Sequence, residues 1–321
     1  MVLVYQASPL FNGNPAYSSF RNRKGEPLFS TSADKEKWRR AAEACDEAIR
    51  VCEDAGWGLV QGNTGEASPL LNTLKDIEQS VQAPGSVSKE IVFQAKTQYS
   101  SMAAWNYFLA HTLPVILNAS GYNDQLQNAP SDGSMSPSMK MVEMYYTEHG
   151  LPIDADNDWA YGNRYKLGSE SSPLYENVIP LNTSVVNLHL KREARFYASI
   201  AGDRMYWQRG NNTLQDDYNL LVQAHKNEEP WGTQADIIVS NTWQNINGYW
   251  LKKHLFSWLP TQNYASGLQN ESAPIIRLAE VYLMQAEAWN EYLEQPDNRV
   301  YDPLDKVRER AGILPVREAW R

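Results

Sequence analysis

The residues with the clearest chemical potential are aromatic and polar side chains that occur together in segments rich in glycine, asparagine and aspartate. They are Trp159, Tyr161, Tyr165, Tyr122, Asn157, Asn163 and Arg164. The C–H face of a sugar can lie flat on an aromatic ring, while amide and guanidinium groups bond its hydroxyls. The pattern marks these residues as candidates for a ligand-binding surface that could take a sugar, and we expect Trp159 and Tyr161 to be exposed on the same side of the molecule. The alternative is that these rings pin long loops to the core.

No catalytic motif accompanies these residues. None of the five histidines lies in an H-E-x-x-H motif, and the sequence contains no G-x-S-x-G. Acidic pairs such as Asp216-Asp217 and Glu228-Glu229 lie on polar stretches, where carboxylates are normally solvated. We therefore expect a binding protein that is not an enzyme. The enzymatic alternative is a glycoside hydrolase, which needs two carboxylates about 5–9 Å apart across the scissile bond.

Three alternating aspartates, Asp154, Asp156 and Asp158, resemble the start of a calcium-binding loop. An EF-hand requires glycine at the sixth position and glutamate at the twelfth, where this chain has Trp159 and Tyr165. The pattern excludes an EF-hand, and we predict no metal and no cofactor. A looser calcium loop and a solvated acidic turn stay open as interpretations of the three aspartates.

Composition and charge limit the class of protein. The chain has 321 residues, of which 42% are hydrophobic, with 11 tryptophans and 18 tyrosines, which predicts a globular protein with a substantial core. The formal net charge is −9 and no basic tract is present, so we expect no nucleic-acid partner. No secretory signal peptide begins the sequence, and no apolar run is long enough to span a bilayer.

The two cysteines, Cys45 and Cys52, lie seven residues apart in a helical pattern. At a rise of about 1.5 Å per residue their Cα atoms would be about 10 Å apart. A disulfide requires less than about 7 Å, so the spacing predicts two unpaired thiols. We expect both to be buried on one face of a helix.

The elements that would position these residues are mainly helices. The apolar spacing from Pro274 to Leu293 predicts a helix capped by Ser272, and a second helix is expected to begin at Asp302-Pro303 and to stop at Gly312. The two would form an antiparallel pair, with Leu278 and Tyr282 buried between them.

Other segments alternate between short elements and loops. Residues 2–13 are expected to be the end of a buried helix that runs into a turn. Helices are expected over 34–54, over 70–81 and from Ser136-Pro137 to about Gly150, with a short strand at 89–94. Residues 14–32, 118–136 and 154–181 are expected to be irregular, whereas 102–117 fits either a buried loop or a distorted helix.

Several of these segments resemble a known family. RLAEVYLMQAEA followed by LDKVRERAGI is similar to the helix pair of the SusD/RagB family, glycan-binding lipoproteins of the Gram-negative outer membrane. Further similar segments follow in family order: YQASPLFNG, WRRAAEACDEAI, KEIVFQ, PSMKMVEMYYTEHGLPI, LKREARFYASI and NGYWLKKHLF. The family's usual Arg-Asp-Pro-Arg is Arg192-Glu193-Ala194-Arg195 here, a departure that bears on the local turn.

The resemblance implies a mostly α, SusD-like fold with tetratricopeptide-type antiparallel helix pairs, long irregular loops and a few short β-strands. It implies one domain over residues 1–321, with helix pairs near 1–54 and 272–312 and ligand-binding excursions near 55–271. By resemblance the chain is a fragment, and the signal peptide, the lipid-attachment cysteine and the C-terminal end of the family lie outside it.

The function implied by the resemblance is non-enzymatic capture of an oligosaccharide or polysaccharide at the cell surface. The glycan would pass to a SusC-like TonB-dependent transporter, and a lipid would anchor the full-length protein to the outer membrane. Two alternatives stay open besides the hydrolase. One is a SusD/RagB-like protein for peptide uptake, and the other is a helical-repeat scaffold with a peptide in a groove between helix pairs.

Overall fold

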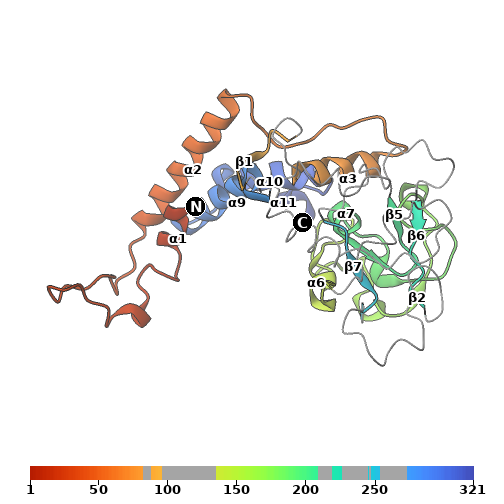
Figure 1. The fold of residues 1–321 in the computed structure, drawn as a ribbon, viewed down its shortest axis with the longest axis horizontal. Coiled ribbons are helices and arrows are strands. Elements are labelled where there is room, and N and C mark those ends of the chain that lie inside the picture. Colours follow the sequence, from red (N-terminus) through yellow and green to blue (C-terminus); the bar gives the residue numbers. More distant parts are fainter. Residues whose placement is uncertain (82–87, 96–134, 209–218, 226–244, 246, 254–272) are drawn as a thin grey trace, which may run out of the picture.

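The computed structural model describes residues 1–81, 88–95, 135–208, 219–225, 245, 247–253 and 273–321. Within these ranges helices predominate, and the strands form two-stranded antiparallel pairs. Figure 1 shows α1 and α2 at one end of the molecule, α6, α7 and most strand pairs at the other, and α9 and α10 between them. The predicted mostly α fold with irregular loops and a few short strands is confirmed.

Four helices build one hydrophobic core, which we call the helical core. They are α1 (Val2–Ala7), α2 (Glu36–Asp54), α9 (Leu278–Tyr292) and α10 (Asn298–Arg310). Buried side chains recur along α2 every three or four residues from Trp38 to Ile49, as one face of a helix requires. Helix α9 packs against both α2 and α10. Leu278 and Tyr282 are buried in this core as predicted, and the hydroxyl of Tyr282 donates a 2.6 Å hydrogen bond to Glu53 of α2.

The first turn of the predicted central helix is a strand instead. Residues Ala273–Arg277 form β8, which pairs antiparallel with β1 (Ile91–Ala95), and α9 begins only at Leu278. Pairing with β1 satisfies backbone groups that a first helical turn would leave without partners. Ile275 consequently lies on the surface, and the expected cap Ser272 lies outside the described residues.

Helix α10 also differs from the prediction at its start. It begins at Asn298, four residues before Asp302, because the side chain of Asp297 accepts a hydrogen bond from the backbone N–H of Arg299. Pro303 therefore lies inside the helix rather than in its first turn. The predicted stop is confirmed: Gly312 has a φ of +73°, and its N–H bonds the carbonyl of Glu309.

The other part of the molecule contains short elements around a second core. Its helices within the described residues are α3 (Pro69–Ser80), α6 (Met139–Met144) and α7 (Ala194–Ser199). Its strand pairs are β2 (Leu167–Gly168) with β3 (Val185–Val186), β4 (Ile200–Gly202) with β7 (Tyr249–Leu251), and β5 (Tyr206–Gln208) with β6 (Asn219–Leu221). A short helix, α11 (Val316–Ala319), lies close to the end of the chain. We call the buried residues packed among α3, α6 and α7 the loop-rich core.

The helix predicted from Ser136 to about Gly150 is much shorter than expected. Ser138 caps α6, which ends at Met144, and Tyr145 is already extended. The guanidinium of Arg192 donates to the carbonyls of Val142 and Tyr145, so these carbonyls have a partner without a further helical turn. The predicted helix at 70–81 and strand at 89–94 occur with shifts of one or two residues, whereas residues 102–117 lie outside the described ranges.

The departure from Arg-Asp-Pro-Arg at residues 192–195 does not prevent a turn. One carboxylate oxygen of Glu193 accepts a 2.7 Å hydrogen bond from the N–H of Tyr146, and Nε of Arg195 lies 2.5 Å from the other. Ala194 then begins α7, at a position where proline would also be tolerated. The two outer arginines and the central acid are therefore enough to form the turn.

A buried ionic cluster joins β1, β8 and α10. The carboxylate of Glu90 is fully buried and lies 2.9 Å from Nη1 of Arg277 and 2.7 Å from Nη1 of Arg310. It also accepts a hydrogen bond from the N–H of Val60. Several donors for one carboxylate are what a buried charge needs to offset its loss of hydration.

Candidate ligand-binding surface

A short 3-10 turn positions three of the predicted ligand-binding residues. The turn covers Tyr161–Asn163, and the N–H of Arg164 bonds back to the carbonyl of Tyr161. The segment that follows β3 holds this turn, because the carbonyl of Arg164 accepts from the N–H of Leu188 and the carbonyl of Asn163 accepts from the Asn187 side chain. The segment therefore has a defined conformation although it is neither helix nor strand.

Arg164 brings the two tyrosines of this segment together. Its guanidinium carbon lies 4.0 Å from the ring centre of Tyr161 and 4.3 Å from that of Tyr165, which is the range of cation–π contacts. Tyr161 nevertheless remains 38% exposed and Tyr165 54% exposed. The arrangement fixes both rings and leaves a large part of each accessible to a ligand.

Glu143 on α6 completes the arrangement. Its Oε1 accepts from Nε of Arg164 and from the hydroxyl of Tyr165, both at 2.6 Å. The hydrogen bond from Tyr165, followed by that from Arg164, lowers the pKa of the Glu143 carboxyl, and the hydrogen bond to Glu143 raises the pKa of both partners. We call Glu143, Tyr161, Arg164 and Tyr165 the tyrosine cluster. No sequence pattern indicated Glu143, because it lies 21 residues before Arg164 and 22 before Tyr165, on another element.

Trp159 is buried, in contrast to the exposed rings of Tyr161 and Tyr165. The side chain is only 8% exposed, packs in the loop-rich core and donates from Nε1 to the carbonyl of Leu190 at 3.2 Å. The prediction that Trp159 presents an exposed face is therefore wrong. Within the described residues Trp159 holds its loop to the core, which is the alternative interpretation of the aromatic residues.

The other predicted residues are either exposed near the cluster in the chain or outside the described residues. Asn157 and Asn163 are exposed, Asn163 within the turn and Asn157 between two aspartates. Tyr122 lies outside the described residues. The structure therefore brings Tyr161, Arg164 and Tyr165 into one cluster, with Asn163 beside them in the chain.

The three alternating aspartates do not form one group of metal ligands. The ligand atoms of His149, Asp156 and Asp158 lie within 4.8 Å of one another, whereas Asp154 is not part of this group. The buried carboxylate of Asp156 accepts from the hydroxyl of Thr147 at 2.6 Å and lies 2.8 Å from Nδ1 of His149. Burial acts to raise the pKa of the Asp156 carboxyl, but these hydrogen bonds prevail and lower it.

This group already has internal partners, and a nitrogen ligand is unusual for Ca²⁺, which prefers oxygen. A metal would have to displace the contact between His149 and Asp156. We therefore assign no ion to it, and the absence of a resident metal stays a prediction.

Comparison with known proteins identifies the family. Residues 89–321 match the family described as the SusD family, SusD_RagB. The chain belongs to the SusD family. SusD-family proteins are carbohydrate-binding and non-enzymatic, and members typically pair with SusC transporters. No curated protein sequence matches the chain significantly. Among the described helices, none is long and apolar enough to cross a membrane.

Two solved structures show the same fold. Two structures named BT4246, one of them the selenomethionine form, superpose with a TM-score of 0.73 at 23% identity over 98% of this chain. A SusD-like carbohydrate binding protein (BF0978) from Bacteroides fragilis covers 98% of the chain at 15% identity and a TM-score of 0.41. The chain spans about half the length of these structures, 54% and 52% of the two BT4246 chains and 51% of BF0978.

Proposed function

We propose that this SusD-family chain binds an oligosaccharide or polysaccharide at the cell surface and delivers it to a SusC-like TonB-dependent transporter. The observation that carries the proposal is the tyrosine cluster, in which two exposed aromatic rings are held by one arginine. In this proposal a lipid anchors the full-length protein to the outer membrane, and the bound glycan is not cleaved.

The tyrosine cluster offers the groups that a sugar needs. An apolar sugar face can lie against the exposed part of Tyr161 or Tyr165. Within the described residues, Oε2 of Glu143 takes part in no hydrogen bond, so it can accept from a sugar hydroxyl. The guanidinium of Arg164 has five N–H groups, so it can donate to a second hydroxyl. Because the rings are already fixed by Arg164, binding need not order them, which reduces its entropic cost.

The decisive experiment removes the two rings. Tyr161→Ala combined with Tyr165→Ala should weaken glycan binding at least about thirtyfold, because loss of one hot-spot anchor costs on the order of 2 kcal/mol. Isothermal titration calorimetry against a panel of neutral and acidic oligosaccharides measures the effect. Tyr5→Ala is the matched control, since Tyr5 is 57% exposed on α1, away from the cluster. Unchanged affinity in the double variant would remove the cluster from the site.

Trp159 tests the difference between anchoring a ligand and anchoring a loop. We expect Trp159→Ala to destabilise the fold by about 3–5 kcal/mol, because it removes a large buried side chain and its hydrogen bond. Binding per folded molecule should change little. Loss of affinity without a change in melting temperature would instead make Trp159 a ligand contact.

Peptide uptake is the second candidate function. Met139, Met141 and Met144 are exposed on α6, the helix that carries Glu143, and flexible methionine surfaces suit varied peptide side chains. Titration with a mixed-sequence peptide library distinguishes the candidates, because a peptide receptor should bind peptides and no glycan.

Incubation with bound glycans tests the hydrolase alternative, and we expect no new reducing ends.

A further inference from the structure

The segment between α1 and α2 forms a second structured excursion, which we call the N-terminal loop (residues 8–35). Figure 1 shows it projecting from the helical end of the molecule. Its base is fixed because the Asn12 side chain donates to the carbonyl of Asp34 and accepts from its N–H, both at 2.9 Å. Its tip turns back at residues 21–27, where the N–H of Leu28 bonds the carbonyl of Phe20.

Four aromatic rings give this loop an internal core of its own. They belong to Phe11, Tyr17, Phe20 and Phe29, and neighbouring ring centres lie between 5.0 and 6.4 Å apart. Phe29 contacts the other three rings. These contacts hold Phe29 in place although little regular secondary structure surrounds it.

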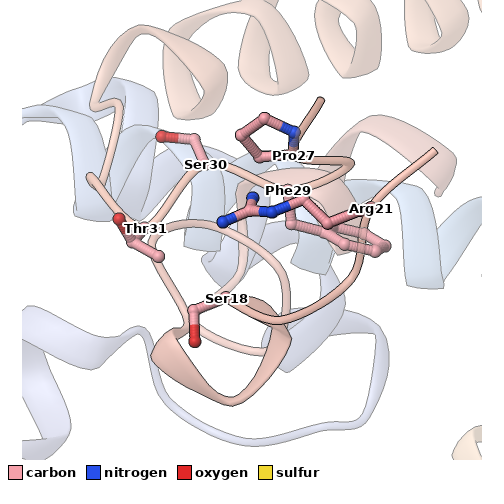
Figure 2. Close-up of a pocket in the computed structure, with 6 residues that line it drawn as sticks. All are labelled: Ser18, Arg21, Pro27, Phe29, Ser30 and Thr31. Carbon is pink, nitrogen blue, oxygen red and sulfur yellow. The ribbon is translucent and has the colours of Figure 1, made fainter. Parts of the chain in front are cut away.

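Phe29 also lines an open pocket of about 600 Å³, a volume within the usual range for small-ligand sites. The other lining residues are Ser18, Arg21, Pro27, Ser30 and Thr31. Figure 2 shows the Arg21 side chain running past Phe29, with its guanidinium among Ser18, Ser30 and Thr31. The pocket therefore combines an aromatic ring, a cation and three hydroxyl side chains.

Arg21 differs from Arg164, because no acidic side chain among the described residues pairs with it. In the described part of the chain the Arg21 guanidinium makes no ion pair or side-chain hydrogen bond, while the nearest acid in sequence, Glu26, is bonded by the Asn22 side chain at 2.6 Å. Arg23 and Lys24 add positive charge to the same turn, in a chain whose formal net charge is −9. A guanidinium without a carboxylate partner favours an anionic ligand group.

We propose that this pocket binds an acidic sugar residue. The sugar carboxylate pairs with Arg21, its apolar ring face lies on Phe29, and its hydroxyls bond Ser18 and Thr31. The site is separate from the tyrosine cluster, and only the choice of a sugar as the ligand rests on the proposed function. In the tyrosine cluster Glu143 already neutralises the arginine, so the two sites differ in the ligand charge that they accept.

The test titrates the full chain with digalacturonate and with its neutral counterpart, galactobiose. Digalacturonate should bind, and Arg21→Gln should weaken it by on the order of tenfold to a hundredfold with an unchanged melting curve. Arg23→Gln is the matched control, because Arg23 lies in the same turn but does not line the pocket. Equal losses in both variants would reduce the effect to general charge and overturn the proposal.

Two further measurements separate the possible failures. Inorganic sulfate that competes as well as digalacturonate at the same concentration would show an anion site without sugar recognition, against the proposal. If neutral glycans bind through Tyr161 and Tyr165 but digalacturonate binds nowhere, the pocket is wrong and the proposed function stands. If digalacturonate binding depends on Arg21 but is unaffected by Tyr161→Ala with Tyr165→Ala, the pocket stands independently of the tyrosine cluster.

Discussion

The helical core and the loop-rich core bury similar side chains but satisfy polar groups in different ways. Each core contains a buried tryptophan that donates one hydrogen bond. In the helical core Nε1 of Trp289 donates to the Asp46 side chain at 3.1 Å, whereas in the loop-rich core Nε1 of Trp159 donates to the backbone carbonyl of Leu190 at 3.2 Å. Helical carbonyls are used within the helices, so the helical core needs a side-chain acceptor, while loops have carbonyls available.

Arg192 shows the same difference on a larger scale. Among the described residues it is the largest fully buried side chain, and it donates to the carbonyls of Val142, Tyr145, Tyr146 and Leu188. Burial lowers the pKa of the guanidinium to about 10, which still leaves it charged at neutral pH. The comparison indicates that the loop-rich core uses one donor for several backbone carbonyls, whereas the polar groups of the helical core are satisfied by single side-chain acceptors such as Asp46 and Glu53.

The largest expected effect is therefore on the loop-rich core. Arg192→Met should lower the free energy of unfolding by about 4 kcal/mol or more, because several buried carbonyls lose their donor at once. Denaturant unfolding measures it. Lys191→Gln is the control, since Lys191 is exposed and its change should stay within about 0.5 kcal/mol. A small effect of Arg192→Met would mean that water can replace the guanidinium.

The helical core should respond to lost volume rather than to lost hydrogen bonds. Leu278→Ala should cost about 2–5 kcal/mol, because Leu278 is fully buried where α9 packs against its neighbouring helices. Leu283→Ala on the same helix is the control, since Leu283 is exposed. Equal unfolding energies for the two variants would contradict the packing of α9.

A fall in pH should destabilise the loop-rich core more than the helical core. His189 in the loop-rich part is buried, and burial lowers its pKa to about 4, below the usual value of about 6.5. Its Nδ1 lies 3.0 Å from the carbonyl of Asp203, which can only accept, so Nδ1 carries the proton and Nε2 accepts from the Tyr249 hydroxyl.

Unfolded His189 takes up a proton as the pH falls below about 6.5, whereas folded His189 does so only near 4. Stability should therefore fall by about 2 kcal/mol between about pH 7.5 and 5. Unfolding curves at both pH values test this, and His189→Gln should flatten the dependence. Hydrogen exchange at the lower pH should show α7 opening before α2. The reverse order would contradict the assignment of this pH dependence to His189.

The smallest effect concerns the two thiols of α2. Both cysteines are unpaired as predicted, but Cys45 is buried whereas Cys52 is only half-buried, which corrects the expectation for Cys52. Burial raises the pKa of both thiols, Cys45 being the more buried. A thiol reagent should label native Cys52 faster than Cys45, and both quickly after denaturation. Equal native rates would indicate that α2 opens locally.

The sequence by itself determined the features that depend on neighbours along the chain. Apolar spacing located α2 and most of α9, the glycine at 312 marked the end of α10, and the spacing of Cys45 and Cys52 ruled out a disulfide between them. The order of similar segments also indicated the family. Helical periodicity, chain reversal and covalent reach act over a few residues, so a single sequence contains them.

Only the tertiary structure decided which aromatic residues are exposed and which charges are paired. Trp159 is buried because Leu190 offers a carbonyl 31 residues away, and Arg164 is paired because Glu143 reaches it from α6. Residues 273–277 form a strand rather than a helical turn because β1, far away in the sequence, pairs with them. Burial, ion pairing and strand pairing are contacts between distant segments, and no local spacing contains the position of a distant partner.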